Sequence, residues 1–232
     1  MDRFASLLCA ASLISPAFAD SRPESLKTPK TTLEFPVAFE KIPAATRDAM
    51  TKVMATPTMT AIAPAEEFVA HAEMYQWLLD HPDRASQAWR KLGVEALEIK
   101  EAKEGRFTWR DAAGSEMVWR TVAQGPKGRV WFAEGKYKPG PLIPSIPVSG
   151  VAILNHSDRP RESGDSLIRH QIEIFLHSDS RAATWATKML GEAAPKMAKD
   201  GAEQMLMFFS GIARYTHNHP DKAKTLFTDK PK

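Results

Sequence analysis

The chain offers a carboxylate and a histidine on one predicted strand as its candidates for acid–base chemistry. The stretch Leu167–His177 carries Glu173 and His177 close to Arg169. A carboxylate and an imidazole in one cavity could transfer protons, as a hydrolase or cyclase requires. Side chains alternate between the two faces of a strand, so Arg169, Gln171 and Glu173 share one face. The ordinary interpretation of that face is a solvated polar ladder across neighbouring strands.

The seven histidines do not form a metal-binding pattern. His217 and His219 lie at the end of the last predicted helix, where a cationic imidazole suits the negative end of the helix dipole. His170 and His177 lie seven positions apart on one strand, face opposite sides and cannot share an ion. Motifs of known hydrolases, metalloproteases and nucleotide-binding loops are not present. We therefore predict no catalytic residue, metal or cofactor, and expect a binding protein rather than an enzyme.

Large aromatic and thioether side chains on the predicted strands and on the last predicted helix point instead to an apolar pocket. Aromatic faces commonly line ligand pockets, and flexible thioether chains adapt to varied ligand shapes. The alternative interpretation is that each side chain packs in a solid core. The predicted ligand-binding residues are Trp109, Trp119, Phe132, Met205 and Phe208.

A proline-rich connection, Tyr137–Pro147, separates two of the predicted strands. Its four prolines remove backbone donors, so it cannot continue the sheet. Leu142, Ile143 and Ile146 are nevertheless too apolar for an ordinary solvated loop. We predict that they form a lid at a cavity mouth or touch a membrane surface. The alternative is a loop that folds back onto the core.

Composition narrows the function classes. The chain has 232 residues, with 31 Lys and Arg against 28 Asp and Glu, a formal net charge of +3. Hydrophobic residues make up 43% and charged residues 25%, which is typical of a globular protein and excludes wholesale disorder. So small a net charge does not favour a nucleic-acid partner, which would need a clustered basic stripe.

The N-terminus resembles a cleavable secretory signal. A short polar start precedes an apolar stretch, Phe4–Ile14, and the small residues Ala17 and Ala19 follow. This pattern predicts cleavage after Ala19 and a periplasmic or secreted protein. Cys9, the only cysteine, lies within the apolar stretch, so the mature chain would contain no cysteine nucleophile, thiolate metal site or disulfide.

Periodicity and turn signals predict an arm over residues 20–39, one α+β domain over 40–220 and a charged tail over 221–232. The stretch Thr56–Pro64 is predicted to be a loop. The predicted helices are Ala44–Ala55, Ala65–Asp80, Asp83–Leu92, Arg181–Leu190 and Pro195–His217; the predicted strands are Glu95–Lys100, Arg106–Asp111, Met117–Ala123, Arg129–Tyr137, Val148–His156 and Leu167–His177.

This order of elements resembles the helix-grip fold of the START-related, SRPBCC-like superfamily. The resemblance implies a curved antiparallel sheet of about six strands, with N-terminal helices and a long C-terminal helix packed on the sheet. It also implies a cavity between them, which members use for apolar ligands and some use for catalysis. We therefore predict an exported carrier of an apolar or amphipathic, lipid-like molecule, with possible peripheral membrane contact. The alternatives are a cavity enzyme and a solid-cored envelope protein that docks a partner.

Overall fold

The computed structural model describes residues 39–138, 144–180 and 193–228. The predicted signal peptide, most of the predicted arm and the predicted helix Arg181–Leu190 lie outside the described residues, as do Leu142 and Ile143.

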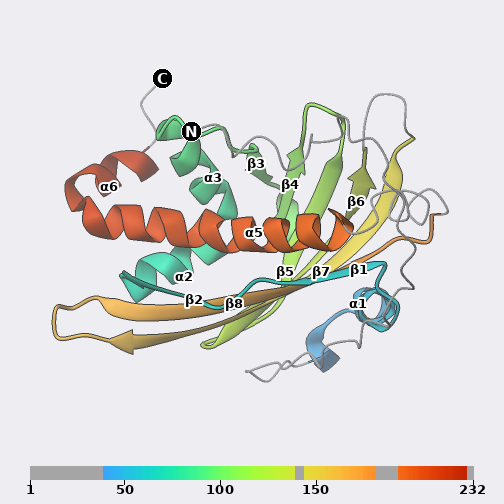
Figure 1. The fold of residues 1–232 in the computed structure, drawn as a ribbon, viewed down its shortest axis with the longest axis horizontal. Helices are drawn as coiled ribbons and strands as arrows, with labels where there is room; N and C mark the ends of the chain where they lie inside the picture. The colour runs from blue at the N-terminus through green and yellow to red at the C-terminus, as the bar shows by residue number, and fades with distance from the viewer. Residues whose placement is uncertain (1–38, 139–143, 181–192, 229–232) are drawn as a thin grey trace.

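A curved, antiparallel, eight-stranded sheet forms the centre of the molecule (Figure 1). Six strands follow one another as neighbours from β3 to β8, so the predicted meander is confirmed. The short strands β1 and β2 both pair with β8, each along a different part of it. The strands are β1 (Met59–Ile62), β2 (Glu66–Ala70), β3 (Ile99–Glu101), β4 (Arg106–Arg110), β5 (Glu116–Gly125), β6 (Gly128–Tyr137), β7 (Ile146–Pro160) and β8 (Ser166–His177).

Alternation along the strands gives the sheet two apolar faces. On β8, Ile172 and Ile174 pack beneath the C-terminal helix, whereas Phe175 packs on the opposite side. On β6, Trp131 and Phe132 likewise belong to two different clusters. We call the face beneath the C-terminal helix the inner face and the opposite one the outer face.

The long helix α5 (Ala193–Asn218) runs across the inner face, with α2 (Ala72–Asp80) and α3 (Pro82–Lys91) beside it (Figure 1). Helix α1 (Ala44–Ala55) packs on the outer face against β7 and β8. Two one-turn 3-10 helices, η1 (Phe39–Lys41) and η2 (Lys103–Gly105), complete the connections. Among the helices of the described part of the chain, none is long and apolar enough to cross a membrane.

The predicted helix Ala65–Asp80 is wrong in its first half, where the chain forms β2. Phe68 and Ala70 point into the core at strand spacing, and β8 supplies the backbone partners of this segment. Helix α2 begins only at Ala72. The apolar residues of this segment happen to match the period of a helix as well. Pairing with the distant strand β8 makes the segment a strand instead.

Two segments predicted to be irregular also contain regular elements. The predicted loop Thr56–Pro64 contains β1, which extends the sheet beyond β8. Part of the predicted charged tail forms helix α6 (Pro220–Phe227), in which the side chain of Leu226 is buried. The segments that form β1 and α6 are too short to show a strong periodic pattern. Their stability comes from contacts with distant parts of the chain, which the local sequence does not reveal.

Candidate functional site

Helix α5 and the sheet are in direct contact over part of the inner face. Leu206, Phe209 and Ile212 of α5 are buried against the sheet in one cluster. The rings of Phe209 and Trp131 stack with centroids 5.9 Å apart and an interplanar angle of 9°. Side chains therefore fill the space that was predicted to separate helix from sheet in this region, and any ligand must bind elsewhere.

Beside this contact, several large apolar residues are only half-buried, among them five on β4, β5 and α5. Trp109 of β4 pairs directly with Met117 of β5, and Trp119 follows on the same face of β5. Met205 and Phe208 of α5, like Trp119, pack only against the edge of the inner cluster. We call these five residues the inner apolar patch.

Helix α3 fixes the position of α5 beside this patch. The indole N–H of Trp89 donates a hydrogen bond of 2.9 Å to the backbone carbonyl of Phe208. A Cβ added at Gly211 would lie only 2.5 Å from the Trp89 ring, so the indole lies directly on the helix backbone. Helix α3 also contacts β3, and Figure 1 shows α5 crossing over the strands β4 and β5, which carry Trp109, Met117 and Trp119.

Four of the five residues predicted to bind ligand share the inner face, and Phe132 does not. Phe132 is 3% exposed and packs on the outer face with Val151 and Phe175. The prediction that it lines the same wall as Trp119 is corrected by the register, which turns its neighbour Trp131 inward instead. Met117 belongs to the patch but was not predicted; its place two residues before Trp119 on the same strand was the available signal.

The predicted lid is described only at one of its three residues. Ile146 is buried and opens β7, where it pairs with Tyr137 of β6. Its backbone therefore belongs to the sheet rather than to a free loop. The predicted lid residues Leu142 and Ile143 lie outside the described residues.

A chain of interacting polar side chains, of which Tyr75, His170 and Ser210 are buried, lies at the other end of the inner face. The hydroxyl of Tyr75 is 2.8 Å from Nδ1 of His170, and Nε2 of His170 is 3.1 Å from a carboxylate oxygen of Glu66. Two residues of α5 also reach this carboxylate: Ser210 donates a hydrogen bond of 3.2 Å, and Arg214 lies 2.8 Å from the other oxygen. The chain thus joins β2, β8, α2 and α5.

Burial keeps the inner groups of this cluster neutral. Loss of solvation raises the pKa of Tyr75 and lowers the pKa of His170, although the hydrogen bond to Glu66 partly opposes the second shift. Burial, helped by the positive charge of Arg129, lowers the pKa of His156 to about 4. Tyr75 and His170 are each 1% exposed, so a substrate cannot reach them. The cluster fastens α5 to the sheet through Ser210 and Arg214.

The residues predicted for acid–base chemistry lie on the outer face and do not converge. Arg169 is half-exposed and lies 4.0 Å from Glu67. Nδ1 of His177 is 2.6 Å from the carbonyl of Thr56, while Glu173 pairs with Ile153 further along β8. Within residues 39–138, 144–180 and 193–228, no group of three or more His, Cys, Asp or Glu side chains could hold a metal ion.

Comparison with known proteins places the chain in no family. No protein-family model matches the chain, and no curated protein matches it significantly. Among solved structures, the chain is similar to a conserved protein from Geobacillus kaustophilus, with 11% identity over 68% of this chain and 97% of that chain and a TM-score of 0.47. It is also similar to a hypothetical protein from Helicobacter pylori (11% identity, 79% and 97% covered, TM-score 0.40).

A third similar structure is Ara h 8.0201, with 15% identity over 68% of this chain and 97% of that chain and a TM-score of 0.36. These likenesses are distant and show neither a family nor a function. The chain itself has the predicted α+β architecture: after α1 come the short strands β1 and β2, the helices α2 and α3 and the meander β3–β8, and the long helix α5 lies across the sheet and is followed by α6.

Proposed function

We propose that this protein is a carrier for an apolar or amphipathic, lipid-like small molecule that binds on the inner apolar patch. One observation carries the proposal: Trp109, Met117 and Trp119 on the inner face of β4 and β5, and Met205 and Phe208 on α5, are large apolar side chains that are only half-buried. Large apolar side chains that gather at a partly open surface are typical of ligand and interaction sites.

The proposed mechanism is transfer of apolar surface out of water. Removing ~300 Å² of ligand surface at ~25 cal/mol per Å² contributes about 7 kcal/mol before the costs of association are subtracted. Met117 and Met205 have unbranched, flexible side chains that can adjust to ligands of different shape. The patch needs no charged partner for this, so an uncharged ligand should bind.

The test is a fluorescence titration with N-phenyl-1-naphthylamine, an uncharged probe that brightens in apolar surroundings. We expect saturable binding to the full chain, and we expect Met205→Gln to weaken it at least about fivefold, because ~1 kcal/mol of apolar contact is lost. Met54→Gln is the matched control, since Met54 is a half-buried methionine on helix α1 of the outer face. An equal effect of both substitutions, or no saturable binding, would contradict the proposal.

We also propose that the carrier is exported, as the N-terminal sequence predicts. When the full chain is expressed in a bacterium with a Sec pathway, the protein recovered from the periplasm or medium should begin at Asp20. Edman sequencing measures this directly. Recovery of an intact chain from the cytoplasm alone would rule the export proposal out while leaving the binding proposal standing.

A further inference from the structure

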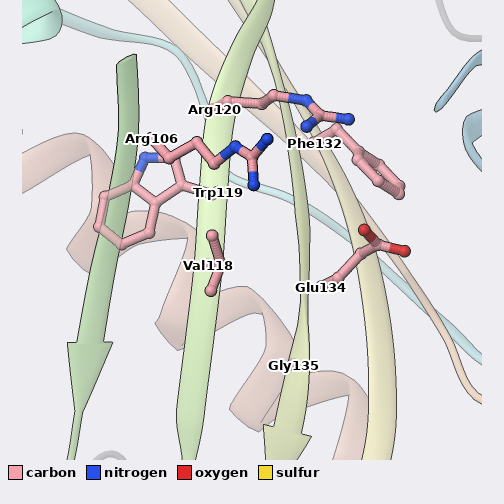
Figure 2. A pocket seen from close by; sticks show the side chains of 7 residues that line it. All are labelled: Arg106, Val118, Trp119, Arg120, Phe132, Glu134 and Gly135. Carbon is pink, nitrogen blue, oxygen red and sulfur yellow. The ribbon is translucent and has the colours of Figure 1, made fainter. Parts of the chain in front are cut away.

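A hollow lies on the outer face of the sheet; Trp119 of the inner apolar patch also borders it, because Trp119 lies between Val118 and Arg120 on β5. It has a volume of about 310 Å³ and opens between strands β4, β5 and β6 (Figure 2). Arg106, Arg120 and Glu134 supply its charges, and Val118 and Phe132 supply its apolar wall. This volume is at the lower end of the range that small-molecule sites occupy.

The two arginines stand opposite each other across neighbouring strands. Arg106 of β4 pairs directly with Arg120 of β5, and like charges in this position repel each other. Figure 2 shows both guanidinium groups extending over the same hollow. An anion bound between the two guanidinium groups would attract both of them and offset their mutual repulsion. A negatively charged ligand would therefore stabilise this arrangement of the two arginines.

The guanidinium groups of Arg106 and Arg120 have different interaction partners. Arg106 forms an ion pair of 2.7 Å with Glu104. Among residues 39–138, 144–180 and 193–228, Arg120 has no carboxylate within ion-pairing distance; one of its terminal nitrogens donates to the hydroxyl of Thr46 on α1. This hydrogen bond orients the guanidinium and leaves other N–H groups available, since arginine has five donors.

The exposed side chain of Val118 and the negative charge of Glu134 restrict which class of ligand can bind in the hollow. Val118 is 42% exposed, which is unusual for a large hydrophobic residue of this chain, and lies opposite Glu134 in the register. An aromatic or short aliphatic body would cover it. The carboxylate of Glu134 disfavours a doubly charged phosphate more than a singly charged carboxylate, and a guanidinium fork matches the planar carboxylate well.

We propose that this outer hollow binds a small organic carboxylate: Arg120, supported by Arg106, holds the carboxylate group, and the apolar body of the ligand lies on Val118 and the edge of Phe132. The site is independent of the carrier function, because it lies on the opposite face of the sheet and recognises charge.

The test is a ¹H–¹⁵N NMR titration of the full chain with benzoate, with benzamide and inorganic phosphate as comparison probes. Benzoate should shift amide signals of β4–β6 around Val118, with a dissociation constant of about 1 mM or tighter, and benzamide should not. Arg120→Gln should weaken benzoate binding at least about tenfold, as expected for loss of a charge-assisted hydrogen-bonded pair.

Two control variants separate recognition of the ligand from damage to the fold. Arg110→Gln changes an arginine on the same face of β4 that pairs with Glu116 and does not line the hollow, so benzoate affinity should stay within about twofold. Thr46→Val removes the hydrogen bond to Arg120 but keeps the charge, so affinity should fall less than with Arg120→Gln.

The proposal is overturned if benzoate causes no localised shifts up to about 10 mM, or if Arg120→Gln leaves its affinity unchanged while its spectrum remains that of the folded chain. Equal binding of benzamide would show that the apolar wall alone is responsible. Tighter binding of phosphate than of benzoate would refute the choice of a carboxylate. None of these outcomes bears on binding of the uncharged probe at the inner apolar patch.

Discussion

Protonation of His156 should destabilise the folded protein as the pH falls. The imidazole is 3% exposed, and its ring meets the Tyr75 ring edge-on with centroids 5.7 Å apart. Burial lowers its pKa from 6.5 to about 4 in the folded chain. The unfolded chain exposes the ring to water, where its pKa is close to 6.5.

The sign follows from proton binding in the two states. Above pH 6.5 both states hold the ring neutral, so the free energy of unfolding is unaffected. Between pH 6.5 and about 4 only the unfolded chain binds the proton, which favours unfolding. The loss reaches about 2 kcal/mol when the pH falls from about 7 to about 5, and about 3 kcal/mol below pH 4.

Urea unfolding at a series of pH values measures this loss in the wild-type chain and in His156→Gln, whose side chain stays neutral throughout. The wild-type free energy should fall by about 2 kcal/mol more than that of the variant between about pH 7 and pH 5. If the wild type and His156→Gln have the same pH dependence, His156 is not held neutral by burial and the reasoning fails.

Three further substitutions test how the helices α5 and α2 pack on the inner face. Gly201→Ala should stabilise the protein by about 0.5–1 kcal/mol in urea unfolding, because nothing lies within 4 Å of the new methyl group and alanine favours a helix. The same change at Gly211 should destabilise by ~1–3 kcal/mol, because the Trp89 ring occupies the space; equal signs would refute the placement of that ring. Tyr75→Phe should cost about 1–3 kcal/mol in thermal or urea unfolding by leaving a buried imidazole nitrogen without its partner, and a neutral effect would show that the hydrogen bond does not hold the fold.

Local sequence patterns were enough to predict the elements with a long, regular period. The alternation of apolar and polar residues on β8 predicted its two faces correctly, and the heavy apolar stripe after Pro195 predicted α5. The short turns between β3 and β6 predicted antiparallel neighbours, because such connections cannot join parallel strands. The α+β class follows from these elements alone.

Features that depend on contacts between residues far apart in the chain could not be predicted from the sequence. Strand β2 lay hidden in a predicted helix, because its pairing partner β8 is about one hundred residues further along the chain. The contact between Tyr75 and His170 spans 95 positions and has no local signature. Phe132 was assigned to the inner face because its size suited a pocket, while only the register of β6 determines which of two adjacent aromatic residues faces inward.

The central claim is that an apolar ligand binds on the inner apolar patch, and methionine methyl NMR tests it most directly. With ¹³C-methyl-labelled methionine, titration with N-phenyl-1-naphthylamine should shift the signals of Met117 and Met205 together, with one shared dissociation constant. The signal of Met50, which is buried in the outer cluster, should stay in place. Shifts confined to outer-face methionines, or unchanged Met117 and Met205 signals at saturating probe, would contradict the account.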